Sequence, residues 1–379
     1  MVFDVHVLGT ASARPTTERA VSGSLVKGPE GIVVIDAGDG FQTRYATQRR
    51  HLKQQDTLDH LKPGHVHVLA FTHGHLDHTW GALPWLQSMD LEGRQTPLLV
   101  IGPTSASAIQ ALRDGQEFGE EVPPADLARQ FLAWFSLGAQ SLQMPIRWIL
   151  GDVAADVWIE LDPASTSVVP LGSLPQPQNW TMMSLKPIAT EHTVPSCGWM
   201  IEYAGKAGAF DRSQAEQLGL SDTQRAQLAR GEDITFPSGQ KLHASSFRDK
   251  ATPPVRVLLS GDTATCPPAW TSQWQPDLLI HEATFLNEHQ SKADEHLHST
   301  ATGAVQSAQA IGAKFLALTH YSNRIKESEV ARQEAILVAN GLPVVALDDA
   351  DRLQVNPFGE VSHLKWNGQT WQTNIPPNR

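Results

Sequence analysis

The sequence predicts an α/β protein in which two mixed sheets pack face to face between flanking helices, an αββα sandwich. The first observation is a series of apolar runs of strand length in two halves of the chain, about 1–103 and 183–353. The second is a set of stretches with helical character between and after those runs. The expected strands lie at 32–35, 66–71, 98–101, 185–189, 255–259, 278–280 and 315–319. The expected helices cover parts of 79–88, 104–113, 125–140, 300–312 and 325–340.

Residues 72–78 read Thr-His-Gly-His-Leu-Asp-His and directly follow an apolar run that we expect to be a buried strand. His73 and His75 alternate, so in an extended segment their imidazoles project the same way and can bind one ion. Asp77 and His78 follow a turn later and can face a second ion. The plainer interpretation is a histidine-rich surface loop or an adventitious nickel-type site. Because four ligand side chains at this spacing behind a strand seldom arise by accident, we favour a metal site.

Three further candidate ligands, His192, Asp262 and His320, lie just past the ends of other apolar runs, where α/β folds place their sites. Taken singly, His192 or His320 is more often an ordinary polar loop residue. Asp262 can bridge two ions, because a carboxylate has two oxygens and carries negative charge. The set assigns His73, His75 and His192 to one ion, Asp77, His78 and His320 to the other, and Asp262 to both. These ligands suit Zn²⁺, with Mn²⁺ or Fe²⁺ as alternatives.

Several motifs outside this ligand set point to one family. They lie at 8–12, 15–22, 36–42, 192–198, 281–284 (His-Glu-Ala-Thr), 298–300 (His-Ser-Thr) and 319–324. With these motifs the chain resembles the metallo-β-lactamase superfamily and, within it, the ribonuclease Z family of endonucleases that trim the 3′ ends of precursor tRNA. The resemblance covers about 1–103 and 183–353, and the 281–284 and 298–300 pair is more specific to ribonuclease Z than the metal motif is.

The resemblance implies a single metallo-β-lactamase-fold domain over 1–356 that holds two divalent metal ions. It implies an endonuclease that removes the 3′ trailer of precursor tRNA, leaves a 3′ hydroxyl, and acts as a cytoplasmic homodimer with no DNA substrate. The family also has a flexible arm that grips the tRNA elbow from a partner subunit, and residues 203–242 occupy its place.

Phosphodiester hydrolysis requires an activated water and a proton for the leaving oxygen. Asp77 could act as the base as well as a ligand, and the family assigns it that role. By resemblance, His298 is the general acid and Glu282 orients it; a carboxylate partner would raise the pKa of this histidine. Alternatively, His298 merely neighbours Ser299 and Thr300, which look like the N-cap of a helix. A helix N-terminus favours phosphate, so these two hydroxyls, together with Arg324, are candidate substrate contacts.

The chain departs from the family pattern in three regions. Residues 104–182 are longer than usual and carry three arginines against nine acidic residues, a net charge of −6 within a chain total of −11. We expect an ordered insertion with an aromatic core of its own, lying away from the RNA path or restricting access, because negative charge repels RNA. In the arm, Leu-Ser-Asp-Thr at 220–223 replaces the family's Pro-Pro-Gly-Pro, and its charges cancel. In the motif at 36–42, Ala37, Asp39 and Phe41 replace Cys, Glu and Thr.

Length and composition agree with a soluble intracellular hydrolase. The 379 residues contain no apolar run long enough to cross a membrane, and the strand-like start does not resemble a signal peptide. We expect Cys197 and Cys266 to be free thiols rather than a disulfide or metal ligands. Residues 357–379 form a C-terminal extension without an assigned role.

Two other functions stay open. A small-molecule hydrolase on the same scaffold, acting on a phosphodiester, lactone or β-lactam, would account for the acidic insertion and the neutral arm. A binding module without catalysis is disfavoured, because the sequence retains a full ligand set.

Overall fold

Two sheets pack face to face in the computed structural model, which describes residues 1–55, 61–206, 208–248 and 251–375. The larger sheet has the strand order β19-β18-β17-β1-β2-β3-β4-β5-β6-β7-β8. Its strands are β1 (Phe3–Gly9), β2 (Gly23–Gly28), β3 (Gly31–Ala37), β4 (Val66–Ala70), β5 (Leu98–Pro103), β6 (Ile146–Asp152), β7 (Val157–Asp162), β8 (Ser167–Leu171), β17 (Arg352–Val355), β18 (Val361–Trp366) and β19 (Trp371–Ile375). Strands β3 to β6 run parallel and the other pairs antiparallel, so the sheet is mixed.

The second sheet has the order β16-β15-β14-β13-β10-β9. Its strands are β9 (Met183–Ala189), β10 (Cys197–Tyr203), β13 (Val255–Leu259), β14 (Leu278–Glu282), β15 (Leu316–Thr319) and β16 (Val344–Ala346). This sheet is also mixed, because β13 to β16 are parallel while β9 and β10 are antiparallel. Every strand expected from the apolar runs is present.

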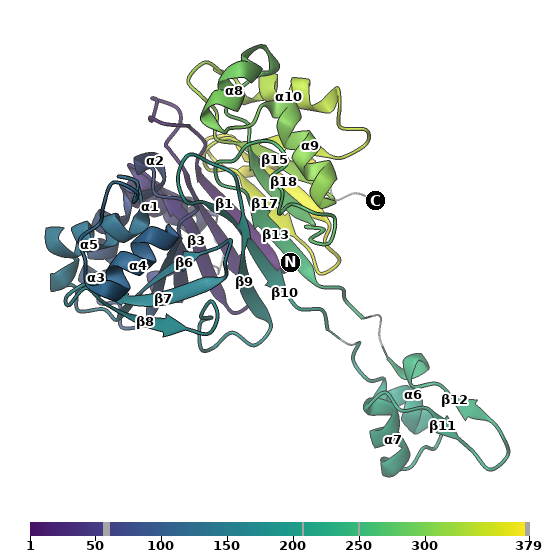
Figure 1. Cartoon of the computed structure of the whole chain (residues 1–379). Helices are drawn as coiled ribbons and strands as arrows, with labels where there is room; N and C mark the ends of the chain where they lie inside the picture. Colours follow the sequence, from purple (N-terminus) through teal and green to yellow (C-terminus); the bar gives the residue numbers. More distant parts are fainter. Residues whose placement is uncertain (56–60, 207, 249–250, 376–379) are drawn as a thin grey trace.

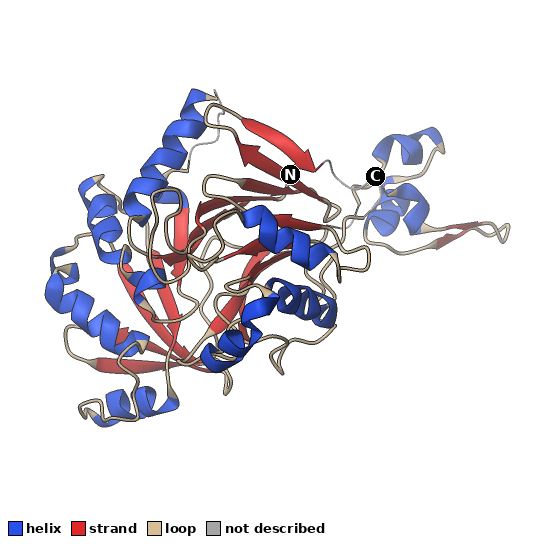
Figure 2. Cartoon of the chain, turned by 90° about the horizontal axis from the view of Figure 1, so that it is seen from above, coloured by secondary structure: helices blue, strands red, loops and turns tan. Residues whose placement is uncertain are grey.

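Helices cover the outer face of each sheet, as Figures 1 and 2 show. Those of the N-terminal half are α1 (Phe41–Gln54), α2 (Leu76–Thr79), α3 (Ala82–Leu91), α4 (Ala106–Asp114) and α5 (Leu127–Leu137). Those of the C-terminal half are α8 (Gln290–His296), α9 (Ala301–Ile311) and α10 (Ser328–Ile336). Separate buried clusters fill the space between the sheets and the space beneath each helical layer. The expected αββα sandwich is therefore confirmed. Among the described residues, no helix has both the length and the apolar character needed to cross a membrane.

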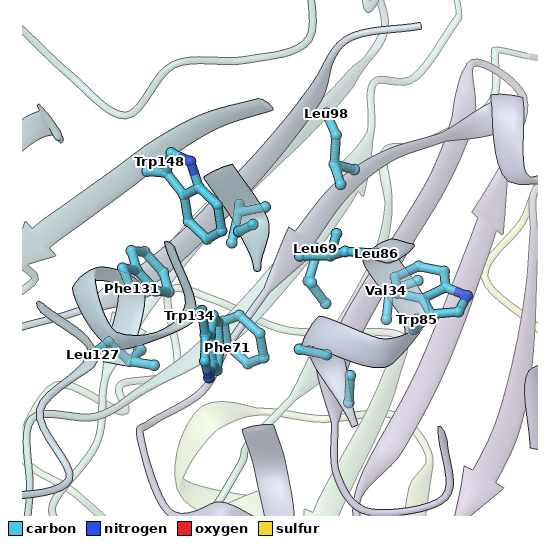
Figure 3. Packing of buried hydrophobic residues seen from close by; sticks show 14 of the residues in the cluster. Val34, Leu69, Phe71, Trp85, Leu86, Leu98, Leu127, Phe131, Trp134 and Trp148 are labelled. Atoms are coloured by element: carbon cyan, nitrogen blue, oxygen red, sulfur yellow. The ribbon is translucent and has the colours of Figure 1, made fainter. Parts of the chain in front are cut away.

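The region 104–182 continues the larger sheet. Strand β6 pairs in parallel with β5, and β7 and β8 extend the sheet to its edge. Phe131, Trp134 and Trp148 pack in the same cluster as Val34 and Leu69 (Figure 3). The expectation of a separate aromatic core was wrong. These aromatic side chains join the cluster that already lies between the larger sheet and its covering helices.

The arm module, defined here as residues 208–248, projects away from the sandwich (Figure 1). It contains α6 (Arg212–Gln217), α7 (Asp222–Ala229), β11 (Ile234–Thr235) and β12 (Lys241–Leu242) around its own small core. Where the family has Pro-Pro-Gly-Pro, Ser221 caps α7 and forms a capping box with Gln224. Of the expected arm 203–242, residue 207 lies outside the described residues.

The C-terminal extension 357–379 forms β18 and β19, which complete the other edge of the larger sheet. Residues 376–379 lie outside the described part of the chain.

A buried ion pair joins β1 to β17. Arg352 donates to both carboxylate oxygens of Asp4, and its guanidinium lies 4.7 Å from the centre of the Trp371 ring. Burial raises the pKa of Asp4, but His6 and Arg352 outweigh it and lower the value to about 2. This carboxylate is therefore ionised and paired at neutral pH.

Asp4→Asn is expected to destabilise the fold by about 3 to 5 kcal/mol, because Arg352 would remain buried without its counter-charge. Urea unfolding at pH 7 measures the loss. Since the folded pKa lies below the ordinary value of 3.8, the difference from wild type should be full above that pH and vanish as the pH falls through about 2. Glu329→Gln, which breaks an exposed pair with Arg332 on α10, should change stability by less than about 1 kcal/mol. Equal effects of the two variants would contradict the prediction.

Candidate metal centre

Seven candidate ligands gather at one end of the sandwich, where strands of both sheets terminate. The loop after β4 carries His73 and His75, and the short helix α2 that follows it carries Asp77 and His78. The second sheet contributes three more from the segments after β9, β13 and β15, namely His192, Asp262 and His320. All seven, drawn from segments far apart in sequence, fall into two adjacent groups.

The first group contains His73, His75, His192 and Asp262, whose candidate ligand atoms lie within 4.8 Å of one another. Nε2 of His73 lies 3.0 Å from Nδ1 of His75, which is 3.3 Å from Nε2 of His192. Burial, reinforced by neighbouring histidines, lowers the pKa of His73 well below its ordinary value and that of His75 to about 4. Neutral imidazoles whose nitrogens converge are suited to share a cation.

The second group contains Asp77, His78 and His320. Nε2 of His78 and Nε2 of His320 are 3.2 Å apart, and each lies within 3.7 Å of Oδ2 of Asp77. Burial raises the pKa of Asp77, but His78 and His320 outweigh it and hold the pKa well below its ordinary value. His320 has a φ of 60°, an uncommon conformation for a residue other than glycine. Such strain often occurs at functional sites.

Asp262 lies between the groups. Its Oδ2 is 3.7 Å from Nε2 of His73, and its Oδ1 is 3.4 Å and 3.3 Å from Nε2 of His78 and His320. Oδ1 is buried and finds no hydrogen-bond partner among the described residues. A buried carboxylate oxygen without a donor is costly, and a cation would satisfy it. The donor set of imidazoles and carboxylates therefore fits two divalent ions.

Hydrogen bonds hold the outer nitrogens of four of these rings, so that Nε2 of each is left to face the centre. Nδ1 of His78 donates to Asp36 over 2.8 Å, and Nδ1 of His192 donates to the carbonyl of Leu297 over 3.1 Å. The partners of Nδ1 of His73 and of His320 are Thr72, at 3.1 Å, and Thr284, at 3.0 Å.

Asp36 is a positioning residue that sequence reasoning missed. It is the penultimate residue of β3, and it accepts hydrogen bonds from the backbone N–H and the hydroxyl of Thr72, each over 2.8 Å, besides that from His78. The motif at 36–42 drew attention to it only as part of a family pattern.

Asp36→Asn is expected to weaken metal binding at the second group by about 10- to 100-fold, because the amide is a poorer acceptor for the His78 ring. Zinc titration against a competing chelator measures both sites. Asp39→Asn, an exposed substitution on the same loop, is the matched control and should leave both affinities unchanged. An unaltered zinc affinity in Asp36→Asn would contradict the positioning role of Asp36.

The region 104–182 contacts the metal-binding loop. The side-chain amide of Gln130 on α5 donates to the carbonyl of Gly74, between the first two histidines. A Cβ at position 74 would lie only 1.7 Å from the carbonyl oxygen of Ala125, so only glycine fits there. This region therefore helps to fix the loop.

Beside the two groups, His298 and Glu282 form a close pair. Nδ1 of His298 lies 2.9 Å from Oε1 of Glu282, which is buried and also accepts the backbone N–H of Thr263 over 2.7 Å. Burial lowers the pKa of His298, but Glu282 outweighs it and raises the value to about 9. His298 is thus suited to donate a proton at neutral pH. It also forms a third group with Asp262 and His320, so distance alone does not exclude it as a ligand.

The three candidate substrate contacts differ in exposure. Thr300 is buried and caps α9 by accepting the N–H of Gly303 over 3.1 Å. Ser299 is also buried, and its hydroxyl donates to the carbonyl of Thr263 over 2.9 Å. Arg324, by contrast, lines a cavity of about 670 Å³ together with His298. The two hydroxyls therefore support the local fold, and Arg324 faces the space beside the acid pair.

Both cysteines are free thiols, as expected. Burial raises the pKa of Cys197 well above its ordinary value, so this thiol is a poor metal ligand.

Comparisons with known proteins agree with this geometry. A family model for the metallo-beta-lactamase superfamily matches residues 16–91. In structure, the chain is similar to human tRNase Z, short form (TM-score 0.55, 19% identity, 93% of this chain and 99% of that one), and to a yeast long-form RNase Z (TM-score 0.59, 16% identity, 93% of this chain and 41% of that one). The chain therefore contains a metallo-beta-lactamase domain.

Curated relatives narrow the relationship. The chain is 28% identical to ribonuclease Z of Myxococcus xanthus over 84% of this chain and 86% of that protein. It is 27% identical to ribonuclease Z of Porphyromonas gingivalis strain W83 over 93% of this chain and 99% of that one. The chain is thus a homologue of the ribonucleases Z over most of its length.

Proposed function

We propose that this protein is a two-metal endoribonuclease that removes the 3′ trailer of precursor tRNA and leaves a 3′ hydroxyl. The observation that carries the proposal is the His298–Glu282 pair beside the two ligand groups, in a chain related to ribonucleases Z along most of its length. We further propose that the protein acts as a homodimer in the cytoplasm, with zinc as the metal.

The seven side chains of the two groups would hold the ions. When bound, two divalent cations supply Lewis acidity for the phosphate and activate water at neutral pH. Oδ2 of Asp77, held by the backbone N–H of Ala13 over 2.7 Å, is placed to accept a proton from the attacking water. His298 protonates the leaving 3′ oxygen, and Glu282 keeps that ring oriented and charged.

The cavity beside His298 suits an RNA strand. Its lining includes three basic side chains, Arg14, Arg324 and Lys326, although the chain as a whole has a net charge of −11. Local positive charge of this kind binds phosphates and contributes most of the affinity for nucleic acid. The acidic region 104–182 contributes no residue to this cavity.

The arm module favours a second candidate, a small-molecule hydrolase. Arg212, Arg225 and Arg230 are each paired with an acidic residue of the arm, at 2.8 Å for Arg212 with Glu216 and 3.0 Å for Arg230 with Glu232. Paired arginines offer less charge to a phosphate backbone than free ones. A phosphodiester, lactone or β-lactam would need no such arm.

Cleavage of a precursor tRNA with a 3′ trailer by zinc- or manganese-loaded protein tests the proposal. We expect one cut directly after the discriminator base, a 3′ hydroxyl product, and no cut by Asp77→Ala. Hydrolysis of bis-p-nitrophenyl phosphate without any RNA cleavage would instead support the small-molecule hydrolase.

A further inference from the structure

Trp80 is unusual among the tryptophans of this chain. The sequence has eleven tryptophans, all within the described residues. Trp80 is 57% exposed, whereas the other ten are buried or partly buried. Leu76, at the start of the short helix α2 that ends just before Trp80, is 56% exposed. Because apolar side chains gain free energy by burial, the fold itself makes little use of this indole. Its position, two residues beyond His78, places it beside the candidate metal centre.

The exposed indole belongs to a pocket. Trp80 and Leu76 line a cavity of about 210 Å³, and Asp77 lines it as well. The remaining lining residues are Ala13, Pro15, Val21 and Asp39. The pocket therefore opens onto the carboxylate that we place in the second metal group. It combines an aromatic face with aliphatic walls, which is the chemistry that binds a flat aromatic ring.

Ala13 lines both this pocket and the larger cavity that contains His298. Its backbone N–H also contacts Asp77, so the loop after β1 separates the two spaces at the metal centre itself. An RNA strand whose scissile phosphate lies at the metals would thus extend into the larger cavity on the His298 side and into the smaller pocket on the Trp80 side.

The polarity of the strand follows from the proposed function, on which this step rests. His298 protonates the 3′ oxygen that leaves, so the nucleotide carrying that oxygen, at the discriminator position, lies on the His298 side. The nucleotide on the far side of the scissile phosphate is the first of the trailer. We propose that the Trp80 pocket binds the base of this first trailer nucleotide, stacked on the indole. Since every base has a π-face, stacking alone tolerates all four bases.

The test combines enzyme and substrate changes. It measures kcat/KM of the metal-loaded enzyme for a precursor tRNA with an intact, an abasic first-trailer, or an abasic discriminator nucleotide. Trp80→Ala should lower kcat/KM for the intact precursor about tenfold or more. Its effect should shrink below about twofold when the first trailer nucleotide is abasic. Trp80→Phe should retain most of the wild-type value. Phe358→Ala, an exposed aromatic in the turn between β17 and β18, is the matched control and should behave as wild type.

Two outcomes overturn the proposal: an equal loss in Trp80→Ala on intact and abasic-trailer precursors, or a loss that depends on the discriminator base. A second readout keeps it testable if the protein cleaves no precursor at all, which would refute the proposed function alone. Tryptophan fluorescence of the metal-loaded protein is titrated with a 5′-phosphorylated tetranucleotide. Stacking predicts quenching in wild type that Trp80→Phe lacks, and identical titrations of the two proteins would exclude the base pocket.

Discussion

Replacing His298 by alanine is expected to lower the turnover of precursor tRNA by about 10²- to 10⁴-fold while both metals stay bound. The side chain is the only group of the Glu282 pair that can give a proton, and its Nδ1 bond to Glu282, 2.9 Å long, keeps it charged. Without it, the 3′ oxygen must leave as an alkoxide or take its proton from water. Single-turnover cleavage and metal content by elemental analysis measure the two quantities together.

The metal content decides between two roles for His298. If His298→Ala loses one equivalent of metal, the residue is a ligand in the group with Asp262 and His320 rather than the acid. Glu282→Gln should show a smaller loss of turnover, because the ring stays in place but is less basic. His65→Ala removes an exposed histidine that precedes β4 and should leave turnover and metal content unchanged.

Removing the arm should lower the cleavage of precursor tRNA by about 100-fold or more. Hydrolysis of bis-p-nitrophenyl phosphate should be unchanged. The structure suggests where to cut. The backbones of Lys206 and Thr252 lie side by side, since the N–H of Thr252 donates to the carbonyl of Lys206 over 3.0 Å. A Gly-Ser turn can therefore replace residues 207–251. The arm core of Ala215, Leu220, Leu228, Ile234, Ala244 and Phe247 is separate from the sandwich clusters, so the deletion should expose no other core.

The two substrates make this deletion informative. If both activities fell together, the arm would serve the fold rather than RNA. If neither fell, the arm would have no part in binding tRNA, in agreement with the pairing of its arginines to acidic residues of the arm itself. A matched change within the arm, Leu228→Ala, should loosen its core and weaken tRNA cleavage less than complete removal does.

The candidate ligands could be selected from the sequence because each carries a local signal. His73 and His75 share a spacing typical of one-ion sites, and His192, Asp262 and His320 each follow an apolar run. Ligands that follow strands of a sandwich tend to meet at one end, and the structure brings all seven together. The strands themselves could be located for the same reason, because buried strands appear as continuous apolar runs.

Contacts between distant segments carried no such signal. Asp36 and His78 lie 42 residues apart in the sequence, and no pattern in either segment predicts their hydrogen bond. Likewise, the aromatic residues of 104–182 predicted burial but not the surface that buries them. Only the pairing of β6 with β5 decides that Trp148 shares a core with Val34. Composition predicted that the acidic region 104–182 lies away from the RNA path or restricts access, but it gave no sign that Gln130 contacts Gly74.

Each group of candidate ligands draws side chains from both sheets. His73 and His75 follow a strand of the larger sheet, whereas His192 and Asp262 follow strands of the smaller one. Ion binding and the association of the two sheets are therefore thermodynamically linked. This coupling is reciprocal. Ions that stabilise the contact between the sheets bind more tightly, by the same free energy, when the sheets are well packed. A substitution that weakens the packing between the sheets, far from any ligand, should consequently lower the affinity for the metal ions.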